Sequence, residues 1–413
     1  MLEVIIIGGG AAGMAAALRA AETGNYRVTL LERQGRVGRK LLSTGNGRCN
    51  LTNTGAAPGD YFGFGASDSA AAFAAPVLER YPPEKILDLF HSYGLKTEEE
   101  YGGRVYPYSG QAGSVLDVLR LAMARLGVNV LTGATAESVR PGPDGFINVS
   151  WDGGGARAER VIVACGGCAG GKLGGVRDGY RLLEALGHGI TPLRPALSPI
   201  RTEPEYPRAL KGVRVKAGAA LWACGEKTEK PAAAEGDVLF TETGLSGSAI
   251  FDLSLHCALA APADEARISL DFFPGEPKER VFALLTANAA RWPEEPANRV
   301  FTGLLQSRLG LMLCKRAGIG GNRAAKSLAK NELAALAETA KAFILPVTGD
   351  GGFDNAQITV GGARRSEFDP ETLQSRRVPG LYVCGEVLDI AARCGGYNLH
   401  WAWASGFTAG ELR

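Results

Sequence analysis

Apolar runs and amphipathic stretches alternate along the first 190 residues of the chain. Residues 4–7 and 161–164 form short apolar runs of the length that buried parallel strands have. The Ala-rich residues 11–23 have helical spacing, and a second strand is predicted at 27–31. Strands that alternate with helices are typical of a parallel sheet in an α/β protein. We therefore predict an α/β domain in this part of the chain.

Further elements follow the same pattern up to residue 190. One helix is predicted to start at Pro83 and to end before Gly94, and a second covers 114–126 and ends at Gly127. A strand is expected at 128–131. Residues 137–140 and 146–151 flank a turn rich in Pro and Gly, which predicts a hairpin. A last helix of this region is expected at 179–186.

The pattern changes after residue 190. Short β-like stretches at 213–215, 219–222, 238–241 and 267–272 alternate with Pro-rich connections, and helical spacing dominates 277–345. Strand and turn signals return at 347–360 and 380–385. We therefore predict an N-terminal domain in two parts, 1–190 and 346–413, which is interrupted by a β-rich domain at 191–276 and a helical cluster at 277–345.

The turn after the first strand has the pattern Gly8-x-Gly10-x-x-Gly13. Between a strand and a helix, these glycines allow a tight turn, a close approach of the backbone to a pyrophosphate, and close packing of helix and strand. Glu32 ends the second strand 19 residues after Gly13, where a carboxylate accepts hydrogen bonds from an adenosine ribose. The alternative is a glycine turn that arose by chance, but its context favours a dinucleotide site.

Composition excludes several classes of function. The 413 residues contain 45 Lys and Arg against 43 Asp and Glu, a net charge of +2, so we expect no nucleic-acid partner. No uncharged apolar run reaches about 18 residues, so we expect no membrane span. The first strand begins at once, without a secretory signal, and the eight Cys have no framework spacing. These features predict a cytoplasmic protein with reduced thiols.

Three segments that lie far apart carry a family resemblance. They are the loop 38–53, the block 236–247, and the tail 380–389 with 395–406. Together they resemble the BaiN-like family of NAD(P)/FAD-dependent oxidoreductases across nearly the whole chain. The resemblance implies a Rossmann-like FAD fold of the two-dinucleotide-binding-domain type, with an inserted barrel-like β-rich and helical domain. This chain differs from the usual family pattern at Cys165, Val360 and His400, where Thr, Ala and Gln are common.

The resemblance and the glycine motif together predict the FAD site. Arg39 and Lys40 are expected beside the pyrophosphate and ribityl chain, although a solvated basic loop is the alternative. Glu386 is expected at the ribityl hydroxyls, and the helix that begins after Gly396 should aim its N-terminus at the flavin. The predicted cofactor-binding residues are Gly8, Gly10, Ala12, Gly13, Glu32, Arg33, Arg39, Lys40, Asn46, Gly47, Arg48, Cys49, Asn50, Gly166, Gly385, Glu386, Gly396, Tyr397, Asn398 and Leu399.

Four residues are candidates for a catalytic role. A cation at Arg48 would stabilise anionic reduced flavin, and the hydroxyl of Tyr106 could protonate the substrate carbon next to the carbonyl. Tyr397 is as well explained as a packing aromatic. His400 could move a proton near neutral pH or form a hydrogen bond within the fold, and the second role is favoured.

The cysteines suggest neither dithiol nor metal chemistry. Cys49 has no partner at a spacing used by redox pairs. Cys165 and Cys168 have CxxC spacing, but no second pair of ligands is present, so packing is the favoured role and no metal is expected.

The sequence thus predicts an FAD-dependent oxidoreductase. Hydride would pass from NAD(P)H through flavin N5 to the activated C=C bond of an apolar, enone-like small molecule. The alternatives are a flavin dehydrogenase or oxidase that works in the reverse direction, an RNA-modifying flavoprotein, and a flavin-binding regulator without turnover.

Overall fold

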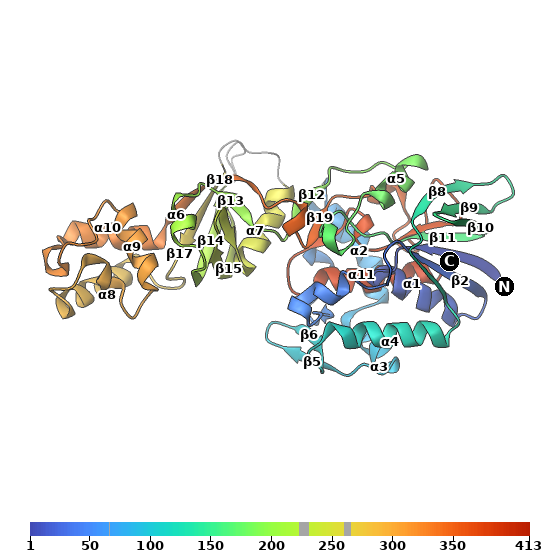
Figure 1. Ribbon diagram of the computed structural model, residues 1–413, viewed down its shortest axis with the longest axis horizontal. Helices are drawn as coiled ribbons and strands as arrows, with labels where there is room; N and C mark the ends of the chain where they lie inside the picture. Colours follow the sequence, from blue (N-terminus) through green and yellow to red (C-terminus); the bar gives the residue numbers. More distant parts are fainter. Residues whose placement is uncertain (66, 223–230, 260–265) are drawn as a thin grey trace. The chain divides into compact units, whose positions relative to one another are not determined.

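The computed structural model describes residues 1–65, 67–222, 231–259 and 266–413 (Figure 1). It divides into two compact units. The first consists of Met1–Pro195 with Ala356–Arg413, and the second consists of Ala196–Asn355. Within the described part of the chain, no helix is both long and apolar enough to cross a membrane.

The first unit is built on a parallel sheet with the strand order β20-β11-β1-β2-β7. Its central strand β1 is almost completely buried from Val4 to Ile7, as its apolar run predicts. The pairing of β11 with β20 joins the two parts of the unit that are separated in sequence. The prediction of a Rossmann-like α/β fold is confirmed. The strands are β1 (Leu2–Ile7), β2 (Tyr26–Glu32), β7 (Asn129–Thr132), β11 (Arg160–Val163) and β20 (Leu381–Val383).

Helices α1 (Ala11–Glu22) and α11 (Tyr397–Gly410) pack with their backbones in contact. A Cβ built on Gly406 would lie 2.4 Å from the carbonyl oxygen of Ala12, and one on Gly410 would lie 2.5 Å from that of Ala16. Only glycine fits at these two places. Because the contacts advance in the same order along both helices, α1 and α11 run in the same direction.

The other elements of the first unit surround this sheet and helix pair. The predicted hairpin at 137–151 gains a third strand, and forms the antiparallel sheet β10-β9-β8. The remaining helices are α2 (Ser67–Arg80), α3 (Pro83–Ser92), α4 (Ala112–Arg125) and α5 (Asp178–Ala185), and the remaining strands are β3 (Thr52–Asn53), β4 (Tyr61–Phe62), β5 (Thr97–Glu100), β6 (Arg104–Pro107), β8 (Ala136–Pro141), β9 (Ile147–Trp151), β10 (Gly154–Ala158), β12 (Arg194–Ala196), β19 (Ile358–Val360) and β21 (Ala391–Ala392).

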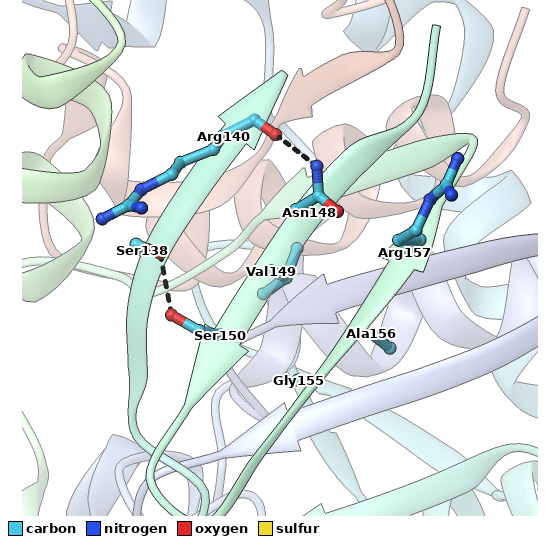
Figure 2. Close-up of a pocket in the computed structure, with 8 residues that line it drawn as sticks. All are labelled: Ser138, Arg140, Asn148, Val149, Ser150, Gly155, Ala156 and Arg157. Atoms are coloured by element: carbon cyan, nitrogen blue, oxygen red, sulfur yellow. Dashed lines mark hydrogen bonds between the residues drawn. The ribbon is translucent and has the colours of Figure 1, made fainter. Parts of the chain in front are cut away.

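A shallow depression lies over the sheet β10-β9-β8, and Figure 2 shows its lining. The hydroxyls of Ser138 and Ser150 are 2.7 Å apart, and the Asn148 amide donates to the carbonyl oxygen of Arg140. Arg157 is paired with Asp144. These polar groups bond to one another along the sheet, so the depression is a polar outer surface rather than a candidate site.

The second unit contains a closed barrel with the strand order β13-β16-β15-β14-β17-β18. In Figure 1, helices α8, α9 and α10 gather at one end of this barrel, and α7 lies at the other. The strands are β13 (Ile200–Thr202), β14 (Arg214–Trp222), β15 (Ala232–Phe240), β16 (Gly244–Ser246), β17 (Arg267–Asp271) and β18 (Phe343–Asp350), and the helices are α6 (Glu205–Ala209), α7 (Ser248–Leu259), α8 (Lys278–Arg291), α9 (Ser307–Arg316) and α10 (Lys330–Lys341).

The insertion differs from the prediction in its internal boundaries. The barrel and the helices share one apolar core, to which Leu270, Leu285 and Phe343 all belong. Strand β18 crosses the predicted boundary at 345/346, so the last barrel strand follows the helical cluster in sequence. Its first apolar residues continue the spacing of α10 and therefore looked helical.

Candidate cofactor and active site

The turn from β1 to α1 leaves an open space before the helix. Gly8 has φ +113°, and a Cβ on Gly13 would lie 1.8 Å from the Gly8 carbonyl oxygen, so the helix packs tightly on the turn. A Cβ on Gly10 would have no heavy atom within 4 Å, and the same holds for Gly166 at the end of β11. The first N–H groups of a helix have no acceptor within it and carry its positive end. This turn, which continues into Ala12, therefore fits the pyrophosphate of a dinucleotide.

Glu32 is fixed at the end of β2 beside this turn. Its Oε2 accepts the N–H of Gly9 at 2.8 Å, and its Oε1 accepts the N–H of Gln34 at 2.6 Å. The carboxylate keeps lone pairs for further donors. Arg33 donates to the carbonyl oxygen of Gly174, and the exposed Arg39 donates to the Gln34 side chain, so neither guanidinium is tied to the turn itself.

Lys40 and Glu386 join the two parts of the first unit. The Lys40 Nζ lies 2.9 Å from Glu386 Oε2, while Glu386 Oε1 accepts the Thr359 N–H at 2.8 Å. Gly385 has φ +75°, and a Cβ there would lie 2.7 Å from the Cβ of Ala12. The carboxylate that was predicted to hold ribityl hydroxyls therefore lies close to the N-terminus of α1.

Two consecutive glycines bring the chain into α11. Gly395 and Gly396 have φ values of +123° and +101°, and a Cβ on Gly396 would lie 2.4 Å from the Thr52 carbonyl oxygen. The Asn398 side chain accepts from the N–H of Ala392 and donates to its carbonyl oxygen. This clamp holds the loop before α11 against the first turn of the helix. Leu399 follows on that turn and is partly buried.

Tyr397 is the first residue of α11 and is held at both ends. Its hydroxyl accepts a hydrogen bond from Arg393 Nη2 at 2.7 Å, and its carbonyl oxygen accepts from the hydroxyl of Tyr61 at 3.1 Å. Arg393 in turn pairs with Asp60 at 2.9 Å. The Tyr397 ring is buried, so its orientation is fixed by packing as well as by these bonds.

Arg48 forms a cation–π contact with Tyr106. The Arg48 guanidinium carbon lies 4.1 Å from the centre of the Tyr106 ring, and Arg48 Nη2 lies 2.5 Å from Glu100 Oε1. Asn46 and Gly47, just before Arg48, are exposed and have positive φ. Glu100 was missed because it stands in an acidic run of the kind that usually faces solvent.

His400 lies in the core of the unit. Its Nδ1 is 2.8 Å from the hydroxyl oxygen of Thr52, and its ring is completely buried. Burial lowers the pKa of His400 to about 4, so the ring is neutral at neutral pH. This environment favours the hydrogen-bonding role over proton transfer to substrate.

Two cysteines lie at or beside the predicted site: Cys49 is buried and Cys165 is partly buried. Burial raises the pKa values of Cys49 and Cys165 to about 12, which keeps both thiols protonated. Cys49 has φ +60° and lies directly before Asn50. In the ranges that the structure describes, no group of three or more His, Cys, Asp or Glu could hold a metal ion.

A buried ion pair near the site was not predicted. Arg365 Nη1 lies 2.8 Å from Asp389 Oδ2, and the Phe64 N–H donates to the same carboxylate. Burial raises the pKa of Asp389 to about 6, and Arg365 opposes this rise. Arg365 follows Arg364 in sequence, and adjacent charges usually face solvent, so the sequence gives no signal of this buried pair.

The N-termini of α1 and α11, each preceded by glycines, are displaced from each other along the helix axes. Gly406 packs opposite Ala12 near the start of α1, whereas α11 begins nine residues earlier at Tyr397. At 1.5 Å per residue, the N-terminus of α11 therefore extends about 13 Å beyond that contact, in the direction in which α1 begins. An elongated dinucleotide with its pyrophosphate at α1 can place its second ring system beside α11.

The sequence profile of the HI0933-like protein Rossmann domain matches residues 2–412. The chain belongs to the HI0933-like family. It is 36% identical over 413 residues to the 3-dehydro-bile acid delta(4,6)-reductase of Clostridium scindens. This match covers 100% of this chain and 98% of the relative. It is 28% identical over 409 residues to the ribosomal RNA dihydrouridine synthase of Escherichia coli, covering 99% of this chain and 97% of the relative.

A solved structure has a comparable fold. The 3-ketosteroid delta1-dehydrogenase of Sterolibacterium denitrificans has a TM-score of 0.50 at 13% identity, over 100% of this chain and 99% of that one. At this identity the likeness concerns the fold alone. Family membership and the full-length similarity to a reductase make this HI0933-like protein an FAD-dependent oxidoreductase, and the predicted resemblance to the BaiN-like family is confirmed.

Proposed function

We propose that this HI0933-like protein reduces a carbon–carbon double bond conjugated with a carbonyl group in an apolar small molecule, with NAD(P)H as the reductant. The observation that carries the proposal is the 36% identity, over the whole chain, to a reductase that acts on a 3-dehydro-bile acid. The two glycine-lined helix N-termini support the FAD part of the proposal.

FAD would be held by groups from both parts of the first unit. The N–H groups at the start of α1, around Gly10 and Ala12, would bind the pyrophosphate, and Glu32 would accept hydrogen bonds from the adenosine ribose. Lys40 and Glu386 would meet the linking chain. Bound FAD would supply the hydride chemistry, because it accepts hydride from a nicotinamide and passes it to an electron-poor carbon.

The first turn of α11 would face the flavin ring. Its N–H groups carry the positive end of a 14-residue helix, which stabilises negative charge. Gly395 and Gly396 precede this turn, and their positive φ values lead the chain into the helix.

Tyr397 is our first choice for the proton donor. Its hydroxyl oxygen already accepts a hydrogen bond from Arg393, so the phenolic proton can be given to a substrate carbon. Tyr106 is the second choice, because its ring lies under Arg48. The buried His400 would orient Thr52 rather than meet the substrate.

Ribosomal RNA is a second candidate substrate, on a specific observation. The 28% identity to a ribosomal RNA dihydrouridine synthase extends over nearly the whole chain. Dihydrouridine is uridine whose ring C=C bond, conjugated with a carbonyl, has been reduced, so the bond that reacts belongs to the same class. The small molecule remains our first choice because of the higher identity and the net charge of +2, which offers little attraction to phosphates.

Anaerobic mixing of the purified holoenzyme with NADH or NADPH tests the proposal. Bleaching of the flavin absorbance by either nucleotide, followed by its recovery on addition of a cyclic enone, is the expected result. If neither nucleotide bleaches the flavin but a saturated ketone does, the enzyme works as a dehydrogenase in the reverse direction. Recovery with a ribosomal RNA fragment and not with enones would favour the second candidate.

A further inference from the structure

Arg104 and Tyr106 lie on the same face of strand β6. Arg104 is exposed and Tyr106 is partly buried, whereas the residues that alternate with them along the strand are buried. Burial raises the pKa of Tyr106, and Arg104 is the cation that opposes this rise most. The charge of Arg104 therefore lies near the Tyr106 hydroxyl.

The Arg104 side chain also reaches the loop before α11. A Cβ built on Gly395 would lie 3.6 Å from Arg104 Nε and 3.5 Å from Cε2 of Tyr397, which is next to the carbon that carries the hydroxyl group. Both are ordinary van der Waals distances, so the guanidinium and the tyrosine ring pack against the same glycine. Arg104 therefore lies beside both candidate proton donors, Tyr106 and Tyr397.

Arg104 differs from the neighbouring arginines in its partners. Its cross-strand neighbour Glu100 accepts hydrogen bonds from both terminal nitrogens of Arg48. Asp60 pairs with Arg393. Within residues 1–65, 67–222, 231–259 and 266–413, the Arg104 side chain has no hydrogen bond or ion pair. An exposed guanidinium in this state offers its N–H donors to a ligand.

The proposed reaction needs a donor beside the tyrosine. When hydride forms a C–H bond at the β-carbon of an enone, the electron pair of the C=C bond moves onto the carbonyl oxygen, which becomes an enolate oxygen. A proton from the tyrosine hydroxyl then forms the C–H bond at the α-carbon, the carbonyl group is restored, and the tyrosinate takes a proton from water. N–H donors that meet an oxygen where negative charge develops lower the barrier.

We propose that Arg104 is a catalytic residue, which donates a hydrogen bond to the carbonyl oxygen of the bound enone and stabilises the enolate oxygen that forms during hydride transfer. The inference rests on the proposed function, because it requires an enone. The phosphates of the reductant are a less suitable ligand, because they carry at least two charges and the arginines next to Arg104 already have acidic partners.

A phenolate tests this contact without turnover, because it carries its negative charge on one oxygen of a planar, conjugated ring. Oxidised holoenzyme is titrated with 4-chlorophenol at several pH values, and the charge-transfer absorbance of the phenolate on the flavin reports its Kd. Arg104→Met should raise this Kd about tenfold over the wild type, which corresponds to about 1.4 kcal/mol. Arg104→Lys, which keeps a cation but not the planar fork, should lie between the two.

Stopped-flow measurements separate the enone step from the other steps. Holoenzyme is reduced anaerobically with dithionite and mixed with a cyclic enone. Arg104→Met should slow this reoxidation about 100-fold, the usual loss for one donor to a developing oxyanion. Its reduction by NAD(P)H should keep the wild-type rate. Arg140→Met is the matched control, because Arg140 is exposed on strand β8 of the same unit, and it should keep the wild-type values throughout.

Equal phenolate Kd values for the wild type and Arg104→Met, or equal rates with the enone, would overturn the inference. A loss confined to reduction by NAD(P)H would also overturn it, and would assign Arg104 to the phosphates of the reductant. If Arg104→Met does not fold, Arg104→Gln replaces it with the same expected losses. If phenolate binding depends on Arg104 but the wild type reduces no enone, the proposed substrate is wrong and the oxyanion contact stands; if the wild type reduces enones at a rate that Arg104→Met shares, only the role of Arg104 fails.

Discussion

The ammonium group of Lys40 lies 2.9 Å from Oε2 of Glu386, a residue 346 positions further along the chain. The other oxygen of the same carboxylate accepts the N–H of Thr359. One carboxylate therefore ties the loop after β2 to strand β19 and to the segment after β20. The proposed FAD site is complete only when both parts of the first unit are in place.

Replacing Lys40 should weaken FAD binding. Lys40→Met leaves the partly buried Glu386 carboxylate without its cation and removes the charge near the proposed phosphate position. We expect the Kd for FAD to rise about tenfold, as for loss of one charge-assisted hydrogen bond. Lys211→Met is the control, because Lys211 pairs with Glu242 at the same 2.9 Å on an exposed surface of the second unit. Equal effects of the two substitutions would contradict the prediction.

Gly396→Ala should damage the site more than other glycine substitutions. At φ +101° a Cβ would lie 2.4 Å from the Thr52 carbonyl oxygen, so strain and collision add. We expect a loss of at least about 2 kcal/mol of unfolding free energy in urea, together with weaker FAD binding. Gly127→Ala, at φ +72° with no atom within 4 Å of the added Cβ, should cost only about 1 kcal/mol and leave FAD binding intact.

His400→Gln should reduce the sensitivity of the fold to acid. The pKa of His400 is lowered from 6.5 to about 4 by burial, so the unfolded chain binds the proton more readily than the folded protein. The stabilisation from the neutral ring is therefore complete above pH 6.5 and is lost as the pH falls toward about 4. The wild type should lose up to about 3 kcal/mol more than His400→Gln over this window. Urea denaturation measures the free energy of unfolding of both proteins between pH 7 and pH 4. An equal loss in the two proteins would contradict the prediction.

Breaking the buried pair of Arg365 and Asp389 should be costly, whereas replacing both partners should cost less. Arg365→Met leaves the carboxylate of Asp389 buried without its cation, which costs about 3–5 kcal/mol in comparable pairs. The double variant with Asp389→Asn removes that charge and should recover part of the loss. Chemical denaturation gives the free energy of unfolding of the wild type, of Arg365→Met and of the double variant. A double variant no more stable than Arg365→Met would show that the loss does not come from the unpaired charge.

The sequence predicts the parts of this molecule that depend on local pattern. The parallel sheet follows from apolar runs such as residues 4–7, and the turn into α1 follows from the spacing of Gly8, Gly10 and Gly13. The two residues Gly395 and Gly396 likewise predict the start of α11. In each case the residues that set the conformation are neighbours in the chain.

Contacts between distant segments were not predictable in the same way. The pair of Arg48 with Glu100 and that of Arg365 with Asp389 depend on which loops meet in three dimensions. Helix α7 was missed, because its polar residues are few and it has no clear apolar stripe. The third strand β10 was missed because Gly154 and Gly155 interrupt the alternation of apolar and polar side chains, although both residues pair regularly with β9.

The most direct test of the proposed function is single-turnover reduction of an enone. The holoenzyme is reduced anaerobically with one equivalent of dithionite and mixed with a steroid that carries a double bond conjugated with its 3-keto group. We expect rapid return of the flavin absorbance and a product heavier by two hydrogen atoms. If the reduced enzyme is reoxidised by oxygen or by ribosomal RNA but by no member of a panel of steroid and smaller cyclic enones, the proposed reduction of an enone is wrong.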